Sequence, residues 1–292
     1  MNTKNITLRI RHLLHPVRAA KSLYYRVSLS VYKHLAEHRF RKIRRGEREW
    51  CWCGGKLLPF KWHSSYDVCA NCACYVNRRP PINLQELYSS RLYWHIMQKY
   101  YGYPAIESRG ELYKRDGRLD YWLQLVRCYG PSQGRVIEIG CPPGILLLEL
   151  QALGYECIGV EPDAKTVDWI QQNMKVNVRA GLFPGVELPN CELFLAFDVI
   201  EHSPNPDQFM HEVARLLNPG GIAIIQTPVN RYSYDPPFGE KFKSAFKEFE
   251  HLFIFTNKSM EMLAELSGLE VVTLDERLWL HHEICVFRKP KT

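Results

Sequence analysis

From Arg135 onward the chain alternates short apolar strands with helical segments, and this alternation restricts its fold more than any other feature. Seven segments have strand character: RVIEIG, CIGVE, NVRAG, LFLAFDVI, GIAIIQT, EVVTL and EICVF. Helical patterns lie between them, near residues 144–153, 163–174, 207–217 and 258–267. Strands that alternate with helices favour a parallel sheet covered by helices on both faces. The sequence therefore predicts a seven-stranded, mostly parallel α/β domain over residues 131–292.

The length and composition allow one such domain with a small accessory module in front of it. The chain has 292 residues, of which 46% are apolar, and this is enough to bury one full α/β core. No apolar run approaches the roughly 20 residues that a membrane-spanning helix needs. Because the N-terminus also lacks the pattern of a secretory signal, we expect a cytoplasmic protein.

Positive charge is concentrated at the N-terminal end. The net charge is +7, but residues 1–50 hold 13 Lys and Arg against 3 Asp and Glu, and the rest of the chain holds 25 against 28. Residues 1–48 are predicted to form a basic amphipathic helical arm. Such an arm can pack on its own domain, lie on the anionic inner face of the membrane, or bind nucleic acid. The near-neutral body disfavours nucleic acid, because a nucleic-acid channel should line the active-site face.

A cysteine cluster follows the arm, in a module predicted over residues 49–80. In a cytoplasmic chain such a cluster suggests a metal before a disulfide. Two closely spaced pairs could supply four thiolates to one structural zinc ion, and we expect these ligands to be Cys51, Cys53, Cys69 and Cys72. An aromatic-rich segment over residues 81–130 then reads as a helical lid or linker.

The segment VIEIGCPPG runs from the first predicted strand into the first predicted helix of the α/β domain. Ligands of such sheets bind where strands end and the chain turns into a helix, and glycine lets the backbone approach them closely. Glu161 ends the second strand, 23 residues after Glu138, a spacing at which a carboxylate can meet the hydroxyl groups of a ribose. Together these features predict a nucleoside-containing ligand.

These segments resemble the class I S-adenosylmethionine-dependent methyltransferases, which have a Rossmann-like fold. The resemblance extends from Arg135 to about Lys289 and rests on EIGCPPG, GVEP, FDVIEHSPNP, LLNPGGIAIIQTP and FEHLFIF. It implies S-adenosyl-L-methionine as the cofactor. It further implies Glu138, Gly140, Cys141 and Gly144 beside the methionine part, Glu161 at the ribose, Gly181 and Leu182 near the adenine, and Asp198 and Val199 at the sulfonium.

One position departs from the family pattern. The family loop usually reads G-C-G-x-G, whereas here Pro142 stands in place of the middle glycine. Proline cannot adopt a positive φ and has no N–H to donate. We expect the cofactor to bind nevertheless, and the departure leaves two alternatives open, an active enzyme or a non-catalytic binding subunit.

Transfer of a methyl group to a hydroxyl needs a base that removes the hydroxyl proton, and histidine suits this role. His251 in FEHLFIF resembles the histidine that sugar-methylating relatives direct at the acceptor, with Glu250 beside it as an orienting group. The alternative is that this histidine serves the fold or the cofactor pocket. The aromatic stretch 229–250 before it is expected to form an acceptor wall or lid. His202 is expected to orient the loop after Asp198.

The cysteine module resembles the zinc ribbon that precedes the core of bacterial sugar C-methyltransferases. Trp50 occupies the position of its first cysteine, so that Cys51 is displaced by one residue, and Ala73 replaces a glycine. The whole pattern predicts a methyltransferase that acts on a hydroxyl of a small-molecule acceptor, namely a sugar or a glycan precursor. A nucleic-acid methyltransferase that uses the ribbon and the arm is the alternative enzyme.

Overall fold

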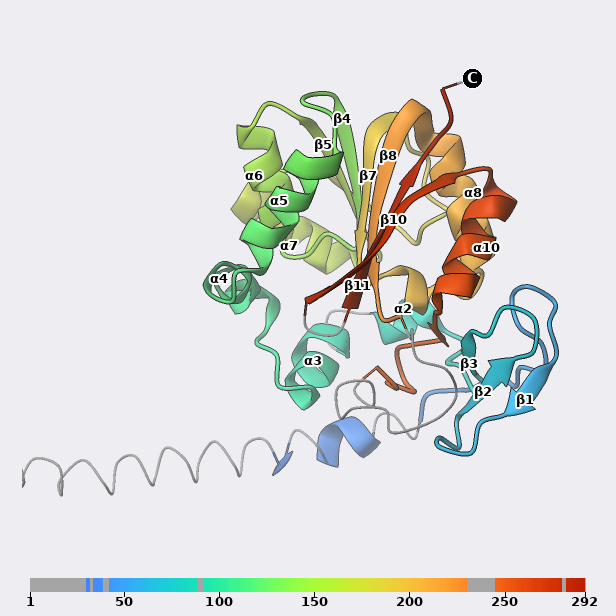
Figure 1. The fold of residues 1–292 in the computed structure, drawn as a ribbon. Helices are drawn as coiled ribbons and strands as arrows, with labels where there is room; N and C mark the ends of the chain where they lie inside the picture. Colours follow the sequence, from blue (N-terminus) through green and yellow to red (C-terminus); the bar gives the residue numbers. More distant parts are fainter. Residues whose placement is uncertain are drawn as a thin grey trace, which may run out of the picture.

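The computed structural model describes residues 30–31, 34–38, 42–88, 92–229, 245–279 and 282–291. Its largest element is a seven-stranded sheet in the order β10-β11-β8-β7-β4-β5-β6 (Figure 1). The strands are β4 Arg135–Ile139, β5 Glu156–Glu161, β6 Val178–Ala180, β7 Cys191–Phe197, β8 Leu217–Thr227, β10 Glu270–Trp279 and β11 His282–Arg288. Strands β4 to β8 pair in parallel, whereas β11 is antiparallel to both of its neighbours. The expected seven-stranded, mostly parallel sheet is confirmed.

Helices cover both faces of this sheet, as the strand–helix alternation predicts. The helices of the α/β core are α5 Arg118–Tyr129, α6 Ile145–Ala152, α7 Ala164–Met174, α8 Pro206–Leu216 and α10 Asn257–Ser267. Along β4 the side chain of Val136 packs with α5, α6 and α7, whereas the next side chain, Ile137, packs with α8 and α10. Successive side chains of a strand point to opposite faces, so each face has its own apolar layer between the sheet and the helices.

The segment before α5 contains short helical turns. These are α2 Leu84–Leu87, the π-helical turn η1 Tyr93–Met97, α3 Gln98–Tyr100, the 3-10 turn η2 Ile106–Ser108 and α4 Arg109–Arg115. The described end of the N-terminal arm packs here, because Ala36 is fully buried in a cluster with Leu87 and Met97. The other residues of the arm, 1–29, 32–33 and 39–41, lie outside the described residues. In the described part of the chain, no helix combines the length and apolarity needed to cross a membrane.

A second, four-stranded sheet joins the cysteine module to the C-terminal half of the chain. Its order is β1-β2-β3-β9, with β1 Leu57–Pro59, β2 Tyr66–Cys69, β3 Tyr75–Asn77 and β9 Phe253–Ile254. The last strand comes from beyond β8, within the region expected to be the α/β domain, and pairs antiparallel with β3. The two regions therefore share one small sheet. The proposed boundaries after residues 48, 80 and 130 stay predictions.

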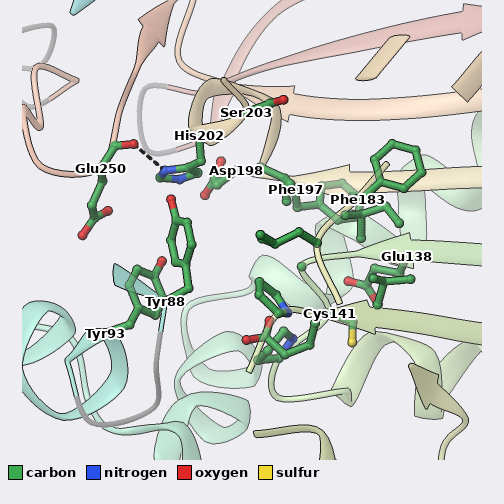
Figure 2. A pocket seen from close by; sticks show the side chains of 18 of the residues that line it. Tyr88, Tyr93, Glu138, Cys141, Phe183, Phe197, Asp198, His202, Ser203 and Glu250 are labelled. Carbon is green, nitrogen blue, oxygen red and sulfur yellow. Dashed lines mark hydrogen bonds between the residues drawn. The ribbon is translucent and has the colours of Figure 1, made fainter. Parts of the chain in front are cut away.

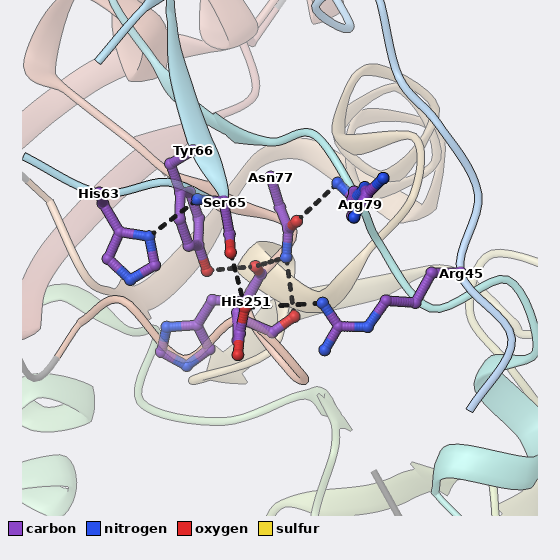
Figure 3. A network of polar contacts seen from close by, with 8 residues as sticks. Arg45, His63, Ser65, Tyr66, Asn77, Arg79 and His251 are labelled. Atoms are coloured by element: carbon purple, nitrogen blue, oxygen red, sulfur yellow. Dashed lines mark hydrogen bonds and ion pairs between the residues drawn. The ribbon is translucent and has the colours of Figure 1, made fainter. Parts of the chain in front are cut away.

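Beside this pairing, side chains of the cysteine module hold the backbone that precedes β9 (Figure 3). The amide Nδ2 of Asn77, which is fully buried, donates to the carbonyl oxygens of Glu248 at 2.8 Å and His251 at 3.3 Å. The hydroxyl of Tyr66 also donates to the His251 carbonyl, at 2.8 Å. Buried backbone groups need such partners, so this network fixes the chain around His251.

We predict that Asn77→Ala lowers the free energy of unfolding by about 1–3 kcal/mol, because it leaves the Glu248 carbonyl and the Arg79 N–H without their present partner. Urea denaturation measures this loss. The matched control is Asn173→Ala, whose exposed side chain makes one local bond to Trp169 and whose loss should cost less than about 0.5 kcal/mol. Equal stability of the two variants would contradict the bracing role of Asn77.

Candidate active site

A cavity of about 410 Å³ opens at the carboxyl ends of the central strands, where the sequence places the ligand site (Figure 2). Its walls come from the loops after β4, β5, β6 and β7. The turn η1, helices α4 and α5, and residues 247–251 cover it from the other side. Segments from both halves of the chain therefore enclose one space.

The loop after β4 turns sharply at two glycines with a left-handed backbone. Gly140 has φ 67°, and a Cβ atom there would lie 2.7 Å from Cγ2 of Val199, so a larger residue would not fit. Gly144 has φ 84° and caps α6, and its Cβ would meet Ile170 of α7. Gly144 is not among the residues that line the cavity, and its expected place beside the methionine part stays a prediction. Pro142 lines the cavity and takes no left-handed conformation.

Two buried carboxyl groups lie where β4 and β5 reach the cavity, at the end that we call the donor end. Glu138 is 4% exposed and Glu161 is 5% exposed, and both line the cavity. Burial raises the pKa of Glu138 well above its usual range and raises the pKa of Glu161 to about 8. The Oε2 atom of Glu138 has no hydrogen-bond partner among the described residues. A buried carboxylate without a partner favours a positively charged or hydrogen-donating ligand.

The other expected cofactor residues also lie on the cavity wall, namely Cys141, Gly181, Leu182, Asp198 and Val199. Asp198 has φ 58°, an uncommon conformation for a residue other than glycine. A chain of hydrogen bonds fixes its carboxylate: Nε1 of Trp122 donates to Gln226 at 3.1 Å, and Nε2 of Gln226 donates to Asp198 at 2.8 Å. Backbone strain like that of Asp198 concentrates at functional sites.

His251 and Glu250, the two expected catalytic residues, both line the cavity and are 1% exposed. Nδ1 of His251 lies 2.7 Å from the carbonyl oxygen of Ala245. Burial raises the pKa of Glu250, and Lys247 and Arg109 oppose this rise. His202 lies beside them, with its ring centroid 5.0 Å from that of His251. Figure 2 shows His202 bonded through its ring to the backbone of Glu250, so it contributes to the cavity wall.

The stretch 229–250 was expected to form an aromatic wall or lid, but the two of its aromatic rings that the structure describes do not line the cavity. Residues 230–244, which hold four of its aromatic side chains, lie outside the described residues. Phe246 packs against Phe60 and His63 of the cysteine module, and neither it nor Phe249 is among the residues that line the cavity. Phe246 therefore packs on the small sheet, whereas Phe249 packs against the cluster of Ala36, Leu87 and Met97.

Two further residues of the cavity could not be singled out from the sequence, namely Arg109 in α4 and Arg118 at the start of α5. Arg109 and Arg118 are 3% and 6% exposed, line the cavity, and stack on the ring of Tyr113. Trp94 and Tyr88 line the same wall. The many aromatic residues of segment 81–130 indicated a lid. The sequence gives no indication that an arginine side chain on a short helix points into a cavity.

The four expected zinc ligands come together away from the cavity. The Sγ atoms of Cys51 and Cys72 are 3.6 Å apart, those of Cys53 and Cys69 are 3.4 Å apart, and all four lie within 4.8 Å of one another. Backbone N–H groups of Asn71 and Cys72 point to the sulfur of Cys69 at 3.4 Å. Zinc–sulfur bonds of about 2.3 Å give sulfur separations of this size, so the residues fit a tetrahedral zinc site.

Comparison with known proteins identifies the domain that carries the cavity. A family model described as a methyltransferase domain matches residues 112–274, more than half of the chain. A solved structure from Nostoc punctiforme that carries an O-methyltransferase name has a TM-score of 0.51 and 17% identity, and the match covers 60% of this chain and 56% of that one. At this identity the likeness shows the fold alone.

Two curated relatives align over a shorter part. A protein of Mycolicibacterium smegmatis named "Probable S-adenosylmethionine-dependent methyltransferase" is 32% identical over 113 residues, 38% of this chain and 42% of the relative. A "Ubiquinone biosynthesis O-methyltransferase" of Maricaulis maris is 34% identical over 113 residues, 35% of this chain and 44% of the relative. The chain thus spans less than half of the length of both relatives. The family match and the geometry of the cavity agree, and the chain belongs to the methyltransferase domain family.

Proposed function

We propose that this protein transfers a methyl group from S-adenosyl-L-methionine to a hydroxyl group of an acceptor. The observation that carries the proposal is the shared cavity, which brings Glu161 at the end of β5 to the same space as His251 beside the small sheet. A methyl donor and its acceptor must meet within one enclosed site, since alignment and exclusion of water provide most of the catalysis.

The donor end of the cavity suits S-adenosyl-L-methionine. The unpartnered Oε2 of Glu138 would accept from the ammonium group, and Glu161 would accept from the two ribose hydroxyls. The guanidinium groups of Arg109 and Arg118, which line the same cavity, suit the carboxylate of the methionine part. The residues therefore offer groups of opposite charge to the ammonium and to the carboxylate of the cofactor.

In the transfer step the acceptor oxygen forms a bond to the methyl carbon while the bond between that carbon and sulfur breaks. S-Adenosylhomocysteine leaves, and the hydroxyl proton passes to a base. We propose that His251, assisted by Glu250, is this base. Both residues line the cavity at the end away from Glu138, which we call the acceptor end (Figure 2). Their burial excludes water, which would compete with the acceptor.

We propose a sugar or a glycan precursor as the acceptor. Aromatic side chains at the acceptor end, among them Tyr88 and Tyr93, offer ring faces with polar tips, and such faces pack against ring-shaped acceptors (Figure 2). The name of the Maricaulis maris relative favours a second candidate, an intermediate of ubiquinone biosynthesis, and it also favours oxygen as the methylated atom.

The cysteine cluster is proposed to hold one structural zinc ion through Cys51, Cys53, Cys69 and Cys72. Four thiolates leave no position for a substrate, so the ion would stabilise the small sheet. Its place in the molecule supports this role, because β2 and β3 of the same sheet contact the backbone of His251.

We predict that Glu161→Gln weakens the binding of S-adenosyl-L-methionine by about tenfold or more, because it removes the charge from hydrogen bonds worth roughly 1.5–3 kcal/mol each. The pKa of the wild-type carboxyl is about 8, so wild-type affinity should rise from pH 6 to pH 9 as the carboxylate forms, and the variant should lack this rise. Calorimetric titration measures both. Glu156→Gln, an exposed change at the other end of β5, is the control. Equal affinities and pH profiles would remove Glu161 from the site.

His251→Ala is expected to reduce turnover by about 10²–10⁴-fold while the affinity for the cofactor changes little. Turnover is measured as transfer of a labelled methyl group to a panel of nucleotide sugars and ubiquinone precursors. His211→Ala removes an exposed histidine that bonds only locally, and it should keep full activity. If His251→Ala abolishes cofactor binding, the residue belongs to the cofactor pocket, and its assignment to the acceptor is wrong.

Metal analysis of the purified protein should find one zinc ion per chain, and Cys69→Ser should remove it. Cys74→Ser is the control, because Cys74 is equally buried and donates to the carbonyl of Ile254 but is not one of the four grouped ligands. A folded, zinc-free wild-type protein, or equal loss of zinc from both variants, would contradict the assignment of the four ligands.

A further inference from the structure

A second group of metal-binding side chains lies at the acceptor end of the cavity, apart from the cysteine cluster. One ligand atom from each of Glu201, His202 and His251 lies within 4.8 Å of the other two, and all three residues have buried or nearly buried side chains. Glu201 and His202 belong to the turn η3, Ile200–His202, directly after β7, whereas His251 precedes β9. The fold thus brings together residues about 50 positions apart in the sequence.

The two histidines are oriented in the same way. Nδ1 of His202 lies 2.9 Å from the carbonyl oxygen of Glu250, and Nδ1 of His251 lies 2.7 Å from that of Ala245. A carbonyl only accepts, so Nδ1 carries the proton in both rings, and Nε2 has the lone pair. Metal-binding histidines characteristically donate their other ring N–H to a carbonyl in this manner.

The carboxyl group of Glu201 has one bonded and one unpartnered oxygen. Its Oε2 accepts from the hydroxyl of Thr227 at 2.9 Å, and its Oε1 has no hydrogen-bond partner among the described residues, although the side chain is fully buried. That same Oε1 lies 3.9 Å from Nε2 of His202. A buried carboxylate oxygen without a donor is costly, and a bound cation is one way to satisfy it.

We propose that Glu201, His202 and His251 bind a divalent first-row metal ion. Bonds from such an ion to imidazole nitrogen or carboxylate oxygen are about 2.0–2.2 Å long. Small side-chain rotations are enough to bring three atoms that lie within 4.8 Å of one another to these distances. One carboxylate and two imidazoles leave coordination positions open, and His202 and His251 line the cavity, so the open positions face the acceptor end.

This inference rests on the proposed function and deepens it. An ion with open positions on the acceptor side binds acceptor oxygens directly and holds the reacting oxygen in one place. Two adjacent oxygens bind such an ion better than one, so the site selects acceptors with neighbouring hydroxyl or carbonyl oxygens, a pattern that vicinal diols and catechols share. In this arrangement His251 would hold the ion and would not itself be the base. The ion would lower the pKa of the bound hydroxyl, and the proton would pass to the carboxylate of Glu250, which lines the same cavity.

The test uses Mn²⁺ and full-length protein with zinc bound at the cysteine cluster, because Mn²⁺ prefers nitrogen and oxygen to sulfur. Electron paramagnetic resonance should show one bound Mn²⁺ per chain, with spin-echo modulation from imidazole nitrogen. Glu201→Gln and His251→Ala should each weaken Mn²⁺ binding by more than about tenfold. His211→Ala, the exposed control, should bind Mn²⁺ as the wild type does.

Absence of Mn²⁺ binding, or binding without imidazole modulation, would overturn the proposal on the wild-type protein alone, even if the variants fail to fold. Binding that His251→Ala leaves unchanged would also overturn it. The affinity of the Mn²⁺-free protein for S-adenosyl-L-methionine separates this outcome from failure of the proposed function. Intact cofactor binding without Mn²⁺ binding rejects only the metal site.

Discussion

The candidate site depends on the position of one backbone segment, residues 247–254. Only two of its residues belong to a strand, so other contacts must fix its position. Its buried carbonyl groups need donors, and the cysteine module provides them through Asn77 and Tyr66 while β3 pairs with β9. Without these bonds the segment would leave buried polar groups unsatisfied, at a cost comparable to much of the stability of a domain. The accessory module therefore helps to form the acceptor end of the cavity.

Four buried acidic side chains lie in or beside the cavity: three of them line it, and Glu201 lies next to it in the turn η3. Glu138, Glu161, Glu201 and Glu250 are all at least nine-tenths buried, and burial raises the pKa of each. Buried acids are unfavourable unless a ligand or a cation compensates them. A sulfonium cofactor with an ammonium group at one end, and a metal ion at the other, would both provide this compensation. Perturbed carboxyl groups in a cleft are characteristic of functional sites.

Local patterns in the sequence predicted most of the fold and several residues that line the cavity. Strand periodicity and the loop from Glu138 to Gly144 are local features, and the structure places the strands, helices and loop where these patterns indicate. The shared small sheet could not be predicted, because β9 is too short to give a periodic signal. Nor could the inward orientation of Arg109 and Arg118, or the meeting of Glu201 with His251, since both depend on contacts between distant segments.

The central claim is that the cofactor binds in the cavity whose other end is formed by His202 and His251. Nuclear magnetic resonance of the histidine rings, with ¹³C at the Cε1 position, tests it directly during titration with S-adenosylhomocysteine. The account predicts that the signals of His202 and His251 shift on binding, whereas the signal of the exposed His211 does not. Saturable binding that leaves both cavity histidines unshifted would place the cofactor elsewhere and contradict the account.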